Sequence, residues 1–171
     1  VYGVKKEKKV TEILHPHPVS IYNKTKMIAE RVLLSFKNKI EVIIIRPATV
    51  CGLSPRMRLD VSVNLLSIQA LQKKKITIFG GKQKRPNIHI SDLADVFILF
   101  LKKKVESGIY NAGFENMSIL QIGKLIKKNI NCKIEIKKIN DIRSYNLDSS
   151  KLLKTGFKPK YSVLDAIKQI K

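Results

Sequence analysis

The amino-acid sequence predicts an α/β fold in which short parallel strands alternate with helices. Three observations lead to this prediction. Residues 22–37 carry apolar side chains at helical spacing, and residues 41–46 (EVIIIR) form the short β-branched run typical of a buried parallel strand. Stretches of these two kinds then alternate along the rest of the chain. Such alternation is the usual pattern of α/β proteins with parallel strands.

The middle of the chain continues this order. A loop punctuated by Gly and Pro at 47–55 leads to a helix at about 61–72 and a strand at 76–79 (ITIF). Gly80 and Gly81 then predict a turn. A short strand is expected at 88–90 (IHI).

The last part of the chain predicts three helices, and capping boxes mark the starts of two of them. A nearly all-apolar helix at about 92–103 and a strand at 108–113 come first. Ser118 with Gln121 then forms a capping box, in which each of the two side chains can bond to the backbone N–H of the other residue. A strand at 133–138 (KIEIKK) follows, and a second box of this kind, at residues 162–165, begins a terminal helix.

Composition indicates one globular unit with a strong positive charge. The chain has 171 residues, of which 44% are hydrophobic and 27% charged, and its 34 Lys and Arg against 13 Asp and Glu give a net charge of +21. Nucleic acid, an acidic membrane or a phosphate-rich ligand could explain such a charge. The lysines, however, are spread in short runs along the whole chain. They predict solvated faces and no nucleic-acid partner.

Cysteine content and hydropathy add three expectations. Cys51 and Cys132 have no metal-ligand spacing, so no metal site is expected, and two lone thiols suit a reducing cytoplasm. The most apolar run, residues 93–101, is about half of the roughly 20 residues that a membrane span needs. No membrane partner is therefore expected.

Tyr22 and Lys26 are the first candidate site residues. They are four positions apart in the predicted helix at 22–37, so their side chains share one face with Cβ atoms roughly 6 Å apart. A free phenol has a pKa of about 10, and a nearby cation favours the phenolate. An isolated Tyr-x-x-x-Lys is weak evidence, because a packed Tyr beside a surface Lys gives the same pattern.

A series of further motifs occurs with this pair in a specific order. They are VYG (1–3), Thr11-Glu12, HPHPVSIYNKTKMIAE (15–30), IIIRPATVCG (43–52), RLDVSVN (58–64), GGKQKRPNIHISDLADV (80–96), YNAG (110–113) and DIRSYNLDSSKL (141–152). Together they closely resemble the extended short-chain dehydrogenase/reductase family, the NAD-dependent epimerases and dehydratases of nucleotide sugars. The resemblance covers nearly the whole chain.

The resemblance implies an architecture. Residues 1–52 would be part of a dinucleotide-binding Rossmann-type domain, and 53–171 would be mainly a small α/β substrate-binding domain, with about 84–115 returning to the Rossmann domain. Family members begin with a glycine-rich turn that seats the dinucleotide, and this N-terminal half is missing here. We therefore expect the chain to be the C-terminal part of such an enzyme, inactive on its own.

The resemblance also implies a catalytic site. Tyr22 would be the acid/base that exchanges a proton with a sugar hydroxyl, and Lys26 would supply the charge that favours phenolate and contact the cofactor ribose. Pro47 and Ala48 would lie against the nicotinamide. Thr49 would face the substrate. The cofactor would be NAD or NADP, with NAD favoured.

Four more residues are implied on the substrate side. Arg85 and Arg143 match positions that hold the nucleotide diphosphate, a role suited to a guanidinium fork. Asn64 matches a residue that contacts the sugar or its phosphate. Asn146 falls where the family often has an Asp that binds a ribose. A salt bridge to a nearby Asp is the alternative for each arginine.

The predicted function is therefore an NAD(P)-dependent epimerase, dehydratase or reductase of a nucleotide-diphosphate sugar. A homodimer formed through the Tyr22 helix is expected by resemblance. Two other hypotheses remain open: a non-catalytic relative that serves as scaffold or regulator, and a basic nucleic-acid-binding module supported only by net charge. The sugar and the reaction type are not readable from these residues.

Overall fold

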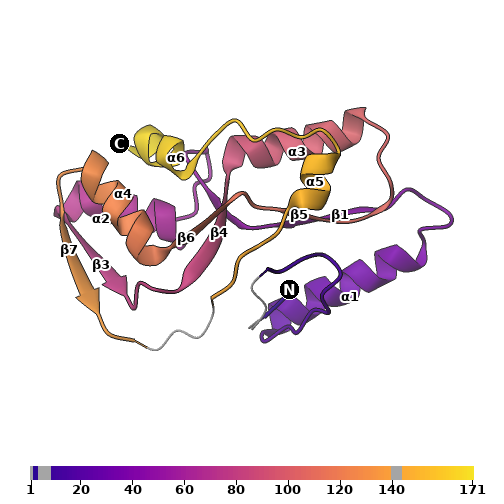
Figure 1. Ribbon diagram of the computed structural model, residues 1–171, viewed down its shortest axis with the longest axis horizontal. Helices are drawn as coiled ribbons and strands as arrows, with labels where there is room; N and C mark the ends of the chain where they lie inside the picture. The colour runs from indigo at the N-terminus through magenta and orange to yellow at the C-terminus, as the bar shows by residue number, and fades with distance from the viewer. Residues whose placement is uncertain (1, 4–8, 140–143) are drawn as a thin grey trace.

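The computed structural model describes residues 2–3, 9–139 and 144–171 (Figure 1). The elements in chain order are α1 (Ile21–Ser35), β1 (Ile43–Pro47), β2 (Thr49–Cys51), α2 (Ser62–Lys73), β3 (Lys75–Phe79), β4 (Lys84–His89), α3 (Ile90–Lys102), β5 (Gly108–Ala112), β6 (Glu115–Ser118), α4 (Ile119–Asn129), β7 (Lys133–Lys137), α5 (Ser150–Lys154) and α6 (Val163–Ile170).

The strands in the described part of the chain form three small sheets. β1 pairs in parallel with β5, β3 pairs in parallel with β7, and β2 pairs in parallel with β4, which also carries β6 in antiparallel orientation. The α/β class with parallel strands is confirmed. Each parallel pair joins segments far apart in sequence, as crossover connections through helices require.

One predicted strand was misplaced. The strand expected at 88–90 is β4, which begins at Lys84 and ends at His89, and Ile90 is already the first residue of α3. The strand ends and the helix begins here because His89 caps the helix: its Nδ1 accepts a hydrogen bond from Ser91 N at 3.1 Å. The sequence analysis also missed β2, β6 and α5.

Both predicted capping boxes are confirmed. Ser118 Oγ accepts from Gln121 N at 3.1 Å, and the Gln121 side chain accepts from Ser118 N at 2.8 Å. Ser162 and Asp165 repeat the arrangement at the start of α6. The helix starts are therefore set by residues within one turn.

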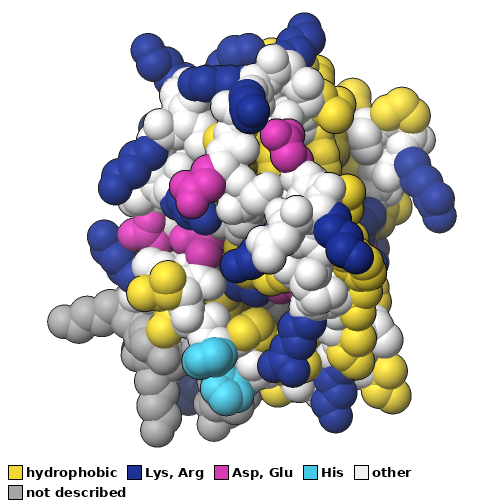
Figure 2. Space-filling model, turned by 90° about the vertical axis from the view of Figure 1, so that its right-hand side faces the viewer, with side chains coloured by type: hydrophobic (Ala, Val, Ile, Leu, Met, Phe, Trp, Pro, Cys, Tyr) yellow, Lys and Arg dark blue, Asp and Glu magenta, His cyan; other side chains and the backbone are white. Residues whose placement is uncertain are grey.

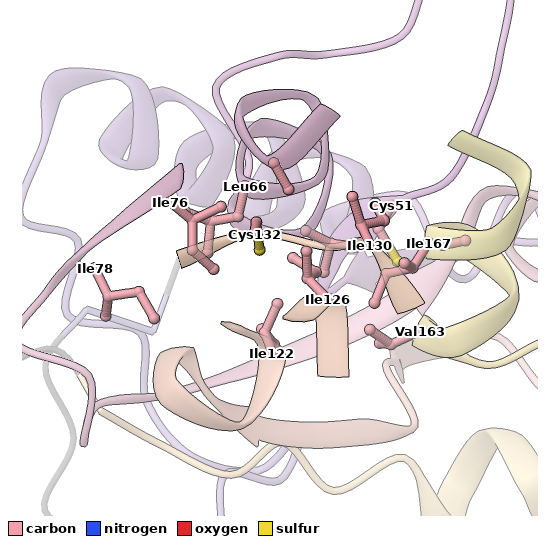
Figure 3. Close-up of a cluster of buried hydrophobic side chains, with 13 residues drawn as sticks. Cys51, Leu66, Ile76, Ile78, Ile122, Ile126, Ile130, Cys132, Val163 and Ile167 are labelled. Atoms are coloured by element: carbon pink, nitrogen blue, oxygen red, sulfur yellow. The ribbon is translucent and has the colours of Figure 1, made fainter. Parts of the chain in front are cut away.

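The described residues form two larger hydrophobic cores and a small third cluster of Tyr2, Val10 and Leu147. The first, shown in Figure 3, packs α2, α4 and α6 around β3, and its buried residues are Cys51, Val63, Leu66, Ala70, Ile76, Ile78, Ile122, Ile126, Ile130, Cys132, Val163, Ala166 and Ile167. The second lies around β5, α3 and α5, with Ile88, Val96, Tyr110, Ala112, Leu152 and Phe157 buried. Ile43 and Ile45 of β1 pack against this second core. The division into residues 1–52 and 53–171, with about 84–115 returning to the first part, stays a prediction.

α1 is separate from both cores. Figure 1 shows it lying along the β1 and β5 pair, away from the group of α2, α4 and α6. None of its residues is buried. Within the described residues, no helix combines the length and apolar character needed to cross a lipid bilayer.

Candidate active site

Tyr22 and Lys26 lie one turn apart on α1, as their spacing predicts. Ser20 begins the helix, because its Oγ accepts a hydrogen bond from Asn23 N at 3.2 Å. Lys26 Nζ lies 5.4 Å from the centre of the Tyr22 ring, within the range of a cation–π contact. The Tyr22 side chain is 67% exposed, so its hydroxyl is accessible to a ligand.

A cavity of about 410 Å³ lies between α1 and β1. Its lining includes Tyr22, Lys26 and Glu30 from the helix and Arg46 and Pro47 from the end of the strand. The carboxyl ends of parallel strands are where open α/β sheets bind ligands. The cavity therefore combines a phenol, an ammonium group and a strand end in one place.

Ala48 and Thr49 continue from this strand end into the next sheet. Ala48 N donates to Ala112 O at 2.8 Å, which extends the β1–β5 pairing by one residue, and Thr49 pairs with Asn87 in the parallel β2–β4 ladder. The chain thus passes from one sheet to the other beside the cavity. Neither residue lines the cavity itself.

A largely buried ion pair attaches α1 to β1. Arg46 Nε donates to Glu30 Oε1 at 3.0 Å, and Arg46 Nη2 donates to Glu30 Oε2 at 2.6 Å. The two side chains are only 7% and 12% exposed. Burial alone would lower the pKa of Arg46, but the Glu30 carboxylate and the Tyr2 hydroxyl outweigh it and raise that pKa. Arg46 is therefore a fixed cation in the cavity wall.

The same arginine connects to the N-terminal segment. Arg46 Nη1 donates to the Tyr2 hydroxyl at 2.8 Å, and that hydroxyl donates to Asn111 Oδ1 at 2.7 Å. Burial raises the pKa of the Tyr2 phenol, so it stays a neutral donor. Asn111 in turn donates to the carbonyls of Val10 and Asp148. The network joins α1, β1, β5 and the segment after residue 143.

Sequence analysis missed this network. The available signal was a single arginine inside the apolar run IIIRP, together with Glu30 on the same helical face as Tyr22 and Lys26. A buried arginine needs a partner, because an isolated charge in an apolar environment is very costly.

Asn64 lies away from the Tyr22 cavity. It is 2% exposed, its Oδ1 accepts from Gly52 N at 3.0 Å, and its Nδ2 donates to Arg58 O at 2.9 Å. These bonds tie the start and the middle of the loop between β2 and α2 to the first turn of α2. Beside this residue, Arg58 forms an exposed ion pair with Asp60 at 2.6 Å.

Arg85 lines a second cavity, of about 280 Å³. Other parts of its wall come from Gln69, Thr77 and Phe79, and the Phe79 ring is half exposed. Arg85 Nη1 donates to Lys84 O at 3.0 Å. An arginine beside an exposed aromatic ring is a combination that suits an anionic ligand carrying a flat group.

The remaining two predicted residues fall elsewhere. Asn146 lines a third cavity, of about 500 Å³, together with Lys84, Asn116 and Asp148. Arg143 lies outside the described residues. Its neighbour Ser144 accepts a hydrogen bond from Lys84 N at 2.9 Å, so the chain after residue 143 passes beside β4.

His89 and Asp92 have structural surroundings. His89 is 2% exposed, stacks on Tyr161 and bonds to Gln169 at 2.9 Å through Nε2. Asp92 accepts from the backbone N–H groups of Lys160 and Tyr161. These bonds hold the segment before α6 onto α3. In the described residues, no group of His, Cys, Asp and Glu side chains is arranged to hold a metal ion.

Known proteins similar to this chain include sugar-nucleotide epimerases and dehydratases. The chain is 36% identical to an uncharacterised UDP-glucose epimerase of Bacillus subtilis (strain 168), over 74% of this chain and 41% of that protein. It is 31% identical to the dTDP-D-glucose 4,6-dehydratase of Bos taurus, over 99% of this chain and 51% of the other. The chain thus spans about half the length of the curated relatives it matches.

Solved structures agree in fold. The UDP-glucuronic acid 4-epimerase of Bacillus cereus, solved in complex with UDP-glucuronic acid and NAD, superposes with a TM-score of 0.83 at 30% identity, over 99% of this chain and 56% of that one. The ADP-L-glycero-D-manno-heptose-6-epimerase of Helicobacter pylori reaches a TM-score of 0.86 at 24% identity and shows the fold alone.

A family model completes the comparison. The model of the NAD dependent epimerase/dehydratase family matches residues 1–113, which include the Tyr22 helix, β1 and β5. The resemblance inferred from the motifs is confirmed over that range and beyond it by the relatives that cover the whole chain. The chain belongs to the NAD dependent epimerase/dehydratase family.

Proposed function

We propose that the complete protein is an NAD(P)-dependent enzyme that epimerises, dehydrates or reduces a nucleotide-diphosphate sugar, with Tyr22 as its acid/base. The observation that carries the proposal is the placement of Tyr22 and Lys26 on one cavity wall, facing the carboxyl end of β1. Family membership supports the reaction class.

The residues present fit a bound nicotinamide cofactor. Tyr22 and Lys26 offer a hydroxyl and an ammonium group to ribose hydroxyls, and Pro47 ends a strand at the same cavity, so it can present a flat apolar surface to a ring. When bound, NAD or NADP would supply hydride acceptance and return. NAD is the favoured form, because similar structures were solved with it.

The chain's own contribution is proton transfer and orientation. The exposed Tyr22 hydroxyl can take a proton from a sugar hydroxyl and give it back, provided that phenolate is stabilised. The Lys26 ammonium group lies against the Tyr22 ring and supplies the stabilising positive charge. Pro47, Ala48 and Thr49 would bound the space in which the sugar and the nicotinamide meet.

We place the nucleotide diphosphate at the second cavity. Its wall holds Arg85, and the half-exposed Phe79 can stack on a base. Arg143 is proposed as the second phosphate ligand because its neighbour Ser144 is bonded to Lys84, next to Arg85. Asn64 and Asn146 stay proposed substrate contacts.

Charge alone gives little support to the nucleic-acid alternative. Figure 2 shows Lys and Arg side chains spread over the face in view, mixed with apolar, polar and acidic groups. A nucleic-acid site usually gathers basic residues into one patch or groove. We therefore propose no nucleic-acid partner.

The test is turnover by the complete protein. A panel of UDP-, dTDP-, GDP- and CDP-sugars with NAD or NADP is followed by product chromatography. Tyr22→Phe and Lys26→Met should each lower kcat at least about a hundredfold. Lys24→Met, an exposed lysine on the same helix, is the matched control and should keep full activity. If no sugar nucleotide turns over, the non-catalytic scaffold becomes the better explanation. If Tyr22→Phe retains full activity, the protein is an enzyme but Tyr22 is not its acid/base.

A further inference from the structure

Glu30 poses an electrostatic problem for the proposed acid/base pair. It lies four residues after Lys26 on α1, the spacing at which opposite charges on a helix form an ion pair. A carboxylate bonded to Lys26 would cancel the positive charge that Tyr22 needs. The three side chains also line the same cavity.

The structure shows where the Glu30 carboxylate goes instead. Arg46 engages both of its oxygens, with Nε at 3.0 and 3.2 Å and Nη2 at 2.6 Å. Such a fork is stronger and more strictly oriented than a bond to a lysine ammonium. Lys26 Nζ meanwhile lies 5.4 Å from the Tyr22 ring centre.

Arg46 is itself held in place from the other side. Its Nη1 donates to the Tyr2 hydroxyl at 2.8 Å, and Tyr2 is bonded to the buried Asn111 on β5. The guanidinium group therefore has partners on two elements and does not depend on Glu30 for its position. The bond to Tyr2 fixes the Arg46 guanidinium group from the side opposite to α1.

We propose that Arg46 is a positioning residue that holds the Glu30 carboxylate away from Lys26, so that the Lys26 charge acts on Tyr22. The inference rests on the proposed function, in which Tyr22 is the acid/base. Nothing in it requires Arg46 to touch the substrate. Its effect passes through Glu30 and Lys26.

The groups that face this site come from four segments of the described chain. They are Lys26 and Glu30 from α1, Arg46 from β1, Tyr2 and Glu12 from the N-terminal segment, and, at longer range, Arg58 with its partner Asp60 from the loop after β2. Arg58 is already neutralised by Asp60. Arg46 is the group among them whose loss frees a carboxylate within reach of Lys26.

Titration of Tyr22 tests the proposal without substrate. Phenolate absorbance of the complete protein is recorded against pH, and the signal of the Tyr22→Phe variant is subtracted. Arg46→Met should move the midpoint of this signal to higher pH by about half a unit, because Glu30 then pairs with Lys26. Arg46→Met with Glu30→Gln should return the midpoint to its original pH.

A second background separates this route from a direct effect of Arg46 on Tyr22. When Lys26 is already Met, the further change Arg46→Met should not move the midpoint. The reason is that, in this proposal, Arg46 acts on Tyr22 only through Glu30 and Lys26. A shift of equal size in that background would overturn the proposal, and so would an unmoved midpoint in Arg46→Met alone. Arg46→Gln is made in parallel. It keeps an amide donor for Glu30 without the charge and so protects the test against misfolding of the Met variant.

Two controls complete the design. Lys75→Met breaks the exposed ion pair with Glu135 on a remote sheet and should leave the Tyr22 signal unchanged. The pH profile of kcat should move with the titration if the enzyme turns over sugar nucleotides. A shifted titration without turnover would contradict the proposed function alone, whereas turnover with an unshifted titration would contradict this inference alone.

Discussion

Asn64 Oδ1 accepts a hydrogen bond from Gly52 N at 3.0 Å, and this bond closes the loop between β2 and α2. The other end of the same amide group donates to Arg58 O at 2.9 Å. One buried side chain therefore ties this loop to α2 at Gly52 and at Arg58. Its structural role is shown, while its contact with substrate stays a proposal.

Asn64→Ala should lower the free energy of unfolding by about 1–3 kcal/mol. The reason is that Gly52 N and Arg58 O lose their partner in a buried setting. Urea denaturation of the complete protein measures the change. Asn129→Ala is the matched control, because it removes a single bond to Leu125 O at the end of α4, and it should cost less than about 1 kcal/mol. Equal losses in the two variants would contradict the loop assignment.

Arg85→Lys should raise KM for the sugar nucleotide by about tenfold with little change in kcat. A lysine keeps the charge but cannot grip phosphate oxygens in two places. Steady-state kinetics measures the two constants separately. Arg31→Lys, at an exposed position on α1, should leave both unchanged. A fall in kcat with constant KM would instead place Arg85 in the chemical step.

Features that depend on local sequence signals were predicted better than features that depend on pairing between distant segments. The starts of α4 and α6 were predictable because each capping box spans four residues, and the spacing of Tyr22 and Lys26 is likewise local. β2 and β6 were missed because three or four residues become strands only through pairing with β4. The cavity between α1 and β1 depends on such a distant contact, namely Arg46 with Glu30.

The carboxyl group of Glu115 makes the stability of the folded protein depend on pH, and the direction of its pKa shift gives the direction of that dependence. Burial raises the pKa of its carboxyl group, the hydrogen bond from Val163 N opposes this, and Asp165 and Asp92 add to it. A raised pKa in the folded state means that Glu115 contributes stability below its ordinary value of 4.5 and loses that contribution as pH rises through the raised pKa. The protein is thus destabilised by this group near neutral pH.

Glu115→Gln should therefore raise the melting temperature near pH 7.5, and the gain should vanish towards pH 4. Gln keeps an oxygen for Val163 N without the charge. Glu135→Gln is a control of opposite sign, because the Lys75 side chain lowers the pKa of Glu135. That variant should lose stability at pH 7.5. Parallel thermal scans compare the two, and a gain for Glu115→Gln that persists at pH 4 would argue for packing instead of charge.

The outer face of α1 should mediate the proposed homodimer. Ile28 and Val32 are each about half exposed on a helix that buries none of its residues, and Phe36, the residue after its end, is exposed to a similar extent. An apolar helical face of this kind is stable in water when another surface covers it, and a second copy of α1 offers the same apolar surface. A dimer built this way would place two copies of the Tyr22 helix side by side.

Val32→Asp should convert the complete protein from dimer to monomer at micromolar concentration. The reason is that a carboxylate buried in an apolar interface would have no partner. Sedimentation velocity measures the oligomeric state. Leu101→Asp tests specificity, because Leu101 is 87% exposed at the end of α3, outside the proposed interface, and this variant should remain dimeric. If Val32→Asp stays dimeric while Leu101→Asp dissociates, the interface lies on α3, and the exposed face of α1 requires another explanation.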